Sequence, residues 1–213
     1  MTNLECPHIW YSELSIIKSF PVSKILTDED HRRYSQYTNT KAKETFFKTR
    51  SFLYIIKKIY QIEDLQLRYT PMGKPYFSNE NNISSEIKIS ISHSQNHVAI
   101  ALCKKSSIGV DIEYRQKNID LNSGLIKLVL NSYEYREFEN TNNKRDLFFQ
   151  LWTLKEAILK VIGSGLSIDM RKVSSPFFLR GLNIATKFIP FGDYACSLAK
   201  IGAFKNYELI KYA

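Results

Sequence analysis

Apolar residues recur at helical spacing in two long stretches of the chain. Between Lys41 and Ile62 they fall three and four positions apart, with lysines and arginines between them: Phe46, Phe47, Phe52, Leu53, Ile56 and Ile59. From Asp146 to Ile162 a second stripe consists of Leu151, Leu154, Ile158 and Val161, and Gly163 and Gly165 follow it. Each stretch predicts a long helix. Thr27, which three acidic residues follow, predicts the start of a shorter one.

Alternating apolar and polar residues predict strands in both parts of the chain. "IKISISHS" (87–94) alternates with period two and "HVAIALCKK" (97–105) is more apolar, so we expect these two runs to form a hairpin. "HIWYSELS" (8–15) predicts an edge strand, while "LQLRYT" and "SSIGVDIEYR" predict two further strands. "SGLIKLVLNSYEYREFEN" has helical periodicity, and the tail after residue 173 predicts several antiparallel strands joined by turns.

This order of elements predicts an α+β fold with two similar halves, each of which contains helices and an antiparallel sheet. We place the N-terminal half at residues 1–106 and the C-terminal half at 107–213. No Gly/Ser-rich linker separates them, so the halves are expected to pack closely against each other.

Composition excludes several classes of protein. The chain has 213 residues, of which 44% are hydrophobic and 24% charged, so global disorder is excluded. No run approaches the roughly 20 apolar residues of a membrane span, and the N-terminus lacks the layout of a secretory signal, so we expect a cytoplasmic protein. The three cysteines lie far apart without zinc-binding spacing, which argues against disulfides and a structural zinc site and predicts that all three are core residues. The net charge of +9 predicts an acidic partner.

Four short segments carry candidate chemistry. In "IGVDIEYR", Asp111 and Glu113 share one face of a strand, an arrangement that either binds a divalent cation such as Mg²⁺ or is simply a solvated acidic face. In "LWTLKEAILKVIGSG", Glu156 and Lys160 lie four apart, which suits either a phosphoryl-transfer site or an ordinary helical ion pair.

The other two segments are turns or strand ends. Gly73-Lys74-Pro75 places a lysine in a rigid turn, either beside a phosphate or merely exposed. Ser92 and His93 end the alternating strand of "ISISHSQ". No G-x-S-x-G sequence accompanies them, so a serine hydrolase is discounted.

Taken together and in this order, GKP, ISHS, GVDIE and W-x-x-K-E-A-x-x-K resemble the 4′-phosphopantetheinyl transferase superfamily, in its larger two-half form. The resemblance covers residues 27–167, with a weaker echo in "GDYACSLA" near the end. It implies two similar α+β halves packed as a pseudo-dimer, and a monomer with one active site between them. The reaction that it implies moves the 4′-phosphopantetheine arm of coenzyme A onto a serine of an apo acyl or peptidyl carrier protein, with Mg²⁺, and releases adenosine 3′,5′-bisphosphate. The pathway, whether siderophore, peptide, polyketide or fatty-acid, stays open.

The resemblance also assigns roles to residues. Asp111, Glu113 and Glu156 match the Mg²⁺ ligands, Glu156 is also the expected general base, and Lys160 is expected to stabilise the leaving bisphosphate. The residues expected to contact coenzyme A are Gly73, Lys74, Pro75, Ser92, His93, Lys155 and, for its 3′-phosphate, Arg50, with Lys48 and Arg33 as weaker candidates. Glu134 matches an additional acid near the metal.

Two other functional classes remain open at this point. A nucleic-acid-binding module could use the basic and aromatic residues of "KTRSFLYIIKKIY", although the aromatic residues there fall on the predicted core stripe. A non-catalytic module that binds carrier proteins is the second alternative, and the intact acids and Lys160 argue against it.

Overall fold

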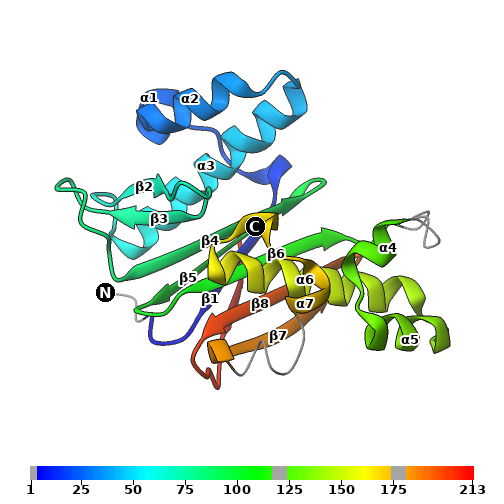
Figure 1. Cartoon of the computed structure of the whole chain (residues 1–213). Coiled ribbons are helices and arrows are strands. Elements are labelled where there is room, and N and C mark those ends of the chain that lie inside the picture. Colours follow the sequence, from blue (N-terminus) through cyan, green and yellow to red (C-terminus); the bar gives the residue numbers. More distant parts are fainter. Residues whose placement is uncertain (1–3, 117–123, 174–180) are drawn as a thin grey trace.

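A computed structural model of the chain describes residues 4–116, 124–173 and 181–213 (Figure 1). The elements up to residue 106 are β1 (His8–Glu13), the 3₁₀ turn η1 (Leu14–Ile16), α1 (Val22–Ile25), α2 (Asp28–Gln36), α3 (Thr40–Tyr60), β2 (Gln66–Tyr69), β3 (Pro75–Ser78), β4 (Ile87–Ser94) and β5 (His97–Lys104). Those that follow are β6 (Ile108–Tyr114), α4 (Gly124–Val129), α5 (Ser132–Asn140), α6 (Lys144–Ile162), the 3₁₀ turn η2 (Gly165–Ser167), α7 (Met170–Val173), β7 (Ile184–Phe191), β8 (Tyr194–Ile201) and β9 (Glu208–Lys211).

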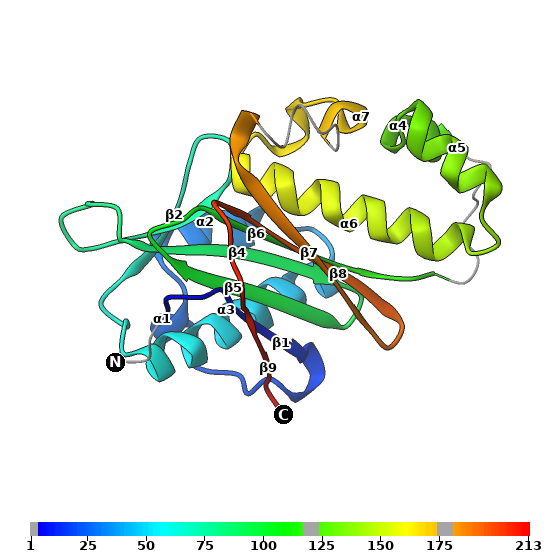
Figure 2. The same cartoon turned by 90° about the horizontal axis from the view of Figure 1, so that it is seen from below.

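The first sheet has the strand order β4-β5-β1-β9. The predicted hairpin is confirmed, because β4 and β5 pair antiparallel from Ile87↔Lys104 to Ser94↔His97. The expectation that the first strand lies at an edge is wrong. On its other side β1 pairs in parallel with β9, in the register His8↔Glu208 (Figure 2). The last strand therefore completes the sheet of the N-terminal half, and the predicted tail is antiparallel only in β7 and β8.

The second sheet has the order β6-β8-β7, and all its pairings are antiparallel. Helix α6 lies along this sheet, whereas α3 lies against the first sheet on the opposite side of the molecule (Figure 2). The α+β class is confirmed by this arrangement of helices on antiparallel pairs. A short separate hairpin, β2-β3, extends from the first half beside β4.

The predicted helices are confirmed, and their ends have local causes. Thr27 caps α2 in a capping box with Asp30, and α6 ends at Gly163, which adopts the left-handed φ of 79°. The apolar stripe of α3 is buried at Phe52 and Ile56, but Ile59 is 43% exposed, so its expected place in the core is wrong. The helical segment before α6 is two helices, because Asn131 starts α5 with a capping box of its own.

The two halves share a core. Ile9, Ala99, Ala101 and Cys103 of the first sheet pack with a set from the second half: Ile108, Val110, Ile112, Ile189, Cys196 and Leu198. Cys103 and Cys196 are buried as expected, whereas Cys6 is only partly buried, so it is not a core residue. The division of the chain between residues 106 and 107 stays a prediction. Strand β9 follows this boundary in the sequence but pairs with β1 of the first half. No helix in the described ranges is long and apolar enough to cross a bilayer.

Gly109 allows α6 to approach β6 closely. A Cβ atom at this position would lie 2.0 Å from the carbonyl oxygen of Ala157 and 2.9 Å from the backbone nitrogen of Val161. Both atoms belong to the helix backbone, which cannot move aside as a flexible side chain could. The glycine of the GVDIE segment therefore sets the separation between the strand and the helix that carry the candidate site.

We expect Gly109→Ala to lower the free energy of unfolding by at least about 3 kcal/mol, because a helix backbone must shift to accept the methyl group. Gly124 is a matched control, since a Cβ there meets nothing within 4 Å. Gly124→Ala should change the free energy of unfolding by about 1 kcal/mol or less. Urea unfolding followed by circular dichroism measures both. Equal effects of the two substitutions would contradict the close-packing argument.

Candidate functional site

Serine hydroxyls of β4 join the edge of the first sheet to the edge of the second. Strands β4 and β6 lie next to each other, but each belongs to a different sheet (Figure 1). The hydroxyl oxygens of Ser90, Ser92 and Ser94 accept the backbone N–H groups of Val110, Ile112 and Tyr114 at 3.0, 3.4 and 3.0 Å. Since both series advance by two residues, the strands run in parallel and stay in register along the whole contact.

The same hydroxyls hold the two acids of β6. Ser92 donates to Oδ1 of Asp111 at 2.7 Å, and Ser94 donates to Oε2 of Glu113 at 2.6 Å. A serine hydroxyl has one proton, and its oxygen already accepts a backbone N–H here. The proton therefore points to the carboxylate, and the orientation of both acids is fixed from the neighbouring half.

Helix α6 brings the remaining candidate residues to the same place. Lys160 donates to Oδ1 of Asp111 at 2.8 Å and to the carbonyl oxygen of Val110 at 3.0 Å. The amine is thus directed at β6, so the simple helical ion pair between Lys160 and Glu156 is not what the structure shows. Asp111, which is 3% exposed, accepts from both Ser92 and Lys160.

The charges of the site are unbalanced in a way that suits a cation. Oδ2 of Asp111 is buried and has no hydrogen-bond partner in the described part of the chain. Burial raises the pKa of Glu113 to about 7 although the Ser94 hydrogen bond opposes this, and burial and the charge of Asp111 raise the pKa of Glu156. A hard divalent ion would take the carboxylate oxygens and relieve both effects, so these residues fit Mg²⁺. Their ligand atoms are not within 4.8 Å of one another, however, so binding would require the side chains to move together.

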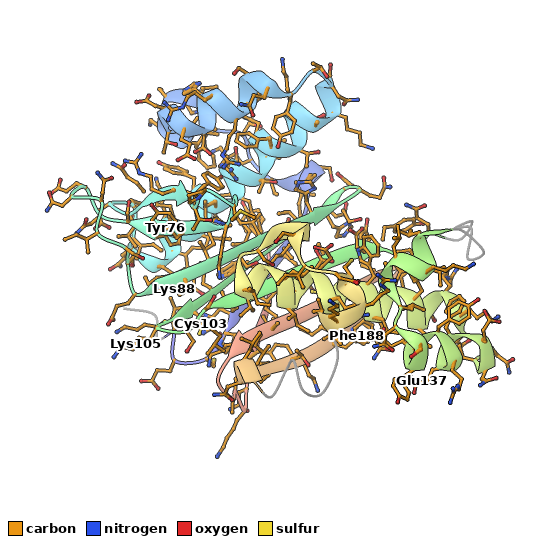
Figure 3. The ribbon with its side chains drawn as sticks, viewed as in Figure 1. Tyr76, Lys88, Cys103, Lys105, Glu137 and Phe188 are labelled. Atoms are coloured by element: carbon orange, nitrogen blue, oxygen red, sulfur yellow. The ribbon has the colours of Figure 1, made fainter. Side chains whose placement is uncertain are left out.

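A pocket of about 210 Å³ joins the two sets of motifs. It is lined by Gly73, Lys74 and Pro75 from the first half and by Glu156 and Lys160 from α6. A neighbouring cavity of about 450 Å³ shares Lys74 and Pro75 with it and is also lined by Tyr76 and Lys88. Figure 3 shows these last two residues on β3 and at the start of β4. The structure therefore brings the GKP and KEA segments, which are more than 80 residues apart, to one opening.

Lys74 is held at the junction of the halves. Its amine donates to Oγ of Ser107 and to the carbonyl oxygen of Val161, each at 2.5 Å. Val161 lies in the last turn of α6, where carbonyl groups lack partners inside the helix. Burial, with a smaller effect of Lys88, lowers the pKa of Lys74 to about 8.

Some of the expected contacts with coenzyme A lie elsewhere. Lys155 is fully buried, and its amine donates to the carbonyl oxygen of Val129 and to Glu134, each at 2.6 Å. It therefore cannot reach a phosphate in this structure, and the expectation for Lys155 is corrected. Glu134 accepts that bond and also caps α5, so it serves the helix junction rather than the acids of β6.

The candidates for the 3′-phosphate also lie outside the pocket. Arg50 is buried and donates to Asp30 at 2.7 Å and to the hydroxyl of Tyr69, in a separate cavity of about 390 Å³. The guanidinium of Arg33 stacks on the Tyr69 ring, and Lys48 donates to the carbonyl oxygen of Ile17. His93 is exposed and borders a fourth cavity beside the start of α3.

The sequence model described as the 4′-phosphopantetheinyl transferase superfamily matches residues 107–202, which include all three acids and Lys160. The chain is 28% identical over 154 residues to the 4′-phosphopantetheinyl transferase gsp of Aneurinibacillus migulanus, covering 70% of this chain and 61% of that protein. It is 34% identical over 100 residues to the 4′-phosphopantetheinyl transferase HetI of Nostoc sp., covering 46% and 42%. It is 31% identical over 124 residues to the 4′-phosphopantetheinyl transferase ffp of Bacillus subtilis, covering 56% and 52%.

Residues 107–202 of the chain are therefore similar to the 4′-phosphopantetheinyl transferase superfamily. The matches of the chain span 42–61% of the length of these three relatives. Among solved structures, the holo-[acyl-carrier-protein] synthase of Thermotoga maritima aligns with 46% of this chain and 64% of its own, with 18% identity and a TM-score of 0.38. The fold of this chain is described from its own helices and strands, independently of that structure.

Three residues support the site but are not among the expected site residues: Ser90, Ser94 and Ser107. Ser90 and Ser94 could have been found from the period-two serines of "ISISHS", which point to one face of a strand. Ser107 donates to the carbonyl oxygen of Val161 at 2.8 Å. No local sequence pattern predicts this contact, because the two residues are 54 positions apart.

The lowered pKa of Lys74 predicts a pH-dependent contribution to stability. The pKa is about 8 in the folded chain and 10.5 in the unfolded one, so the unfolded chain binds more protons between these pH values. The wild-type protein should therefore gain stability relative to Lys74→Met as pH rises from 7 to 10, by about 1–2 kcal/mol after allowance for partial exposure.

Urea unfolding of both proteins at pH 7, 8, 9 and 10 measures this difference. The matched control is Lys172→Met, because Lys172 is exposed on α7 and should show no such trend relative to the wild type. A difference between the wild type and Lys74→Met that does not change with pH would contradict the assignment.

Proposed function

We propose that this chain transfers the 4′-phosphopantetheine arm of coenzyme A to a serine of an apo acyl or peptidyl carrier protein in a Mg²⁺-dependent reaction. The observation that carries the proposal is the pocket that joins Gly73, Lys74 and Pro75 with Glu156 and Lys160 beside the acids of β6. The match of residues 107–202 to the superfamily model and the similarity to relatives named 4′-phosphopantetheinyl transferases support the same reaction. We further propose that the protein acts as a cytoplasmic monomer.

In this reaction, the hydroxyl oxygen of the carrier serine attacks the phosphorus that bears the pantetheine arm. The bond between that phosphorus and the oxygen bridging to the adenosine side breaks, and adenosine 3′,5′-bisphosphate leaves. When bound by Asp111, Glu113 and Glu156, Mg²⁺ would neutralise negative charge on the pyrophosphate. Asp111 is the best-prepared ligand, because one of its oxygens is buried without a partner in the described residues.

Glu156 is assigned the removal of the serine proton, and Lys160 is assigned the stabilisation of the leaving bisphosphate. The raised pKa of Glu156 makes its carboxylate a better proton acceptor, so it suits removal of the serine proton directly or through a water molecule. Lys160 carries a positive charge at the rim of the same pocket, where it can stabilise the departing bisphosphate. Lys74 also lines the pocket and is assigned a contact with a phosphate of coenzyme A. To make that contact, its amine would give up its hydrogen bonds to the Ser107 and Val161 oxygens.

The carrier is proposed to be acidic. The net charge of +9 would raise the rate of encounter with such a partner by electrostatic attraction. The nucleic-acid alternative loses support, because Phe52 and Tyr60 of that segment are buried and cannot stack on bases.

The reaction is tested by incubating the full chain with tagged coenzyme A, Mg²⁺ and a panel of apo carrier proteins, and by measuring the mass of each carrier. We expect a mass gain equal to the tagged arm, and a loss of at least about 100-fold in rate for Asp111→Ala or after removal of divalent ions. Glu86→Ala, which changes an exposed acid, is the control. Wild-type rates in Asp111→Ala would remove the proposed metal site, and no mass gain on any carrier would overturn the function.

Lys74 and Lys160 should affect different kinetic constants. Lys74→Ala should mainly raise KM for coenzyme A, because a phosphate contact is made in both the ground state and the transition state. Lys160→Ala should mainly lower kcat, because its charge matters most as the bisphosphate leaves. Circular dichroism of both variants checks that they fold. A change in KM alone for both variants would contradict the role given to Lys160.

A further inference from the structure

Three potential metal ligands meet where the two ends of the chain pair. In the parallel contact of β1 with β9, His8 lies opposite Glu208, and Cys6 lies two residues before His8. One ligand atom from each of Cys6, His8 and Glu208 lies within 4.8 Å of the other two. No other group of three histidine, cysteine or acidic side chains does so in the parts of the chain that the structure describes. This cluster is separate from Asp111, Glu113 and Glu156.

The geometry of the His8 imidazole suits a metal ligand. His8 is only 4% exposed, and its Nε2 atom is buried without a hydrogen-bond partner among the described residues. Its Nδ1 atom lies 2.6 Å from the hydroxyl of Tyr60, which also accepts the indole N–H of Trp10 at 3.0 Å. A metal-bound histidine usually bonds through its second nitrogen to such a fixed group, which leaves the other nitrogen for the metal.

The distances suit a small tetrahedral ion. Nε2 of His8 and Oε2 of Glu208 are 3.6 Å apart. The bond lengths of tetrahedral zinc place a nitrogen and an oxygen ligand about 3.4 Å apart and a nitrogen and a sulfur ligand about 3.5 Å apart. The histidine and the carboxylate are therefore already close to the required separation, and a small rotation of the partly buried Cys6 side chain would complete the three.

We propose that Cys6, His8 and Glu208 bind a Zn²⁺ ion, with water in the fourth position. Thiolate, imidazole and carboxylate together favour zinc over Mg²⁺, which takes oxygen ligands. A cavity of about 450 Å³ beside Cys6 and Glu208 leaves room for that water. Of the two lysines that line the cavity, Lys200 directs its amine to the carbonyl oxygens of Ile201 and Ala203. Glu5 lines the same cavity and adds a negative charge to that of Glu208.

The ion would tie β9 to β1. Strand β9 is four residues long, and Leu209 on it is 39% exposed, so it buries little apolar surface of its own. A metal bound by Cys6, His8 and Glu208 closes a loop of about 200 residues, and its binding releases the thiol proton to solvent. The sequence spacing argues against a zinc site, because zinc motifs are recognised by ligands that lie near one another in the chain, whereas Glu208 lies 200 residues after His8.

The test uses Co²⁺ as a spectroscopic substitute for Zn²⁺, on the full chain freed of metal and then saturated with Mg²⁺. We expect Co²⁺ to produce a thiolate-to-metal charge-transfer band and intense tetrahedral bands, at one equivalent, and Zn²⁺ to abolish them. Cys6→Ser should lose the charge-transfer band, and Glu208→Gln should weaken Co²⁺ binding at least about 10-fold. Both side chains are at least partly exposed, so neither substitution is expected to prevent folding.

Cys103→Ser and Asp111→Asn are the matched controls. Cys103 is the buried cysteine of β5, labelled in Figure 3, and Asp111 belongs to the oxygen-rich site of β6. Both variants should keep the wild-type Co²⁺ spectrum. The proposal is overturned if the wild-type chain gives no thiolate band, if Cys6→Ser keeps it, or if Cys103→Ser loses it.

Thermal unfolding supplies an independent readout. Zn²⁺ at about 100 times its dissociation constant should raise the unfolding temperature of the wild-type chain by about 5–10 °C, because it binds the folded state. The increase should vanish in Cys6→Ser and persist in Cys103→Ser. An equal increase in Cys6→Ser would place the ion elsewhere and overturn the proposal.

Discussion

Three hydroxyl groups hold the two sheets together, and the candidate site depends on them. Strand β6 is the edge of its sheet, and its N–H groups at residues 110, 112 and 114 face β4, where Ser90, Ser92 and Ser94 accept them. A buried N–H group without a partner would cost about 1–3 kcal/mol, so the serines are needed for the halves to meet. Because an accepting hydroxyl must still place its own proton, the contact that joins the halves also orients two acids.

The other edge of β6 is hydrogen-bonded to β8, and close backbone packing fixes helix α6 against one face of the strand. Gly109 lets the backbone of α6 lie against the strand, and this helix carries Glu156 and Lys160 to the acids. The strand is therefore held by serines from one half and by β8 and α6 of its own half. Lys160 forms an ion pair with Asp111, while burial raises the pKa values of Glu113 and Glu156.

The sequence predicted the local elements better than their assembly. Periodicity and caps located α2, α3 and α6 and the β4-β5 hairpin, because these depend on residues close in the chain. Motif resemblance named the three acids, which the structure places with Lys160. It failed for Lys155, whose burial depends on Glu134 at 21 residues' distance, and it could not detect the pairing of β1 with β9, whose registered residues are 200 positions apart. Long-range partners leave no mark on a local pattern.

The return of the last strand to the first has a consequence for biosynthesis. While the ribosome is still making the chain, β1 can pair with β5, but its other edge has no neighbour until residues 208–211 emerge. An open strand edge is a template for pairing with other chains. The first half is thus translated early, but its sheet is complete only after residues 208–211 have been made. The rate of chain elongation therefore sets how long the edge of β1 can pair with a neighbouring nascent chain.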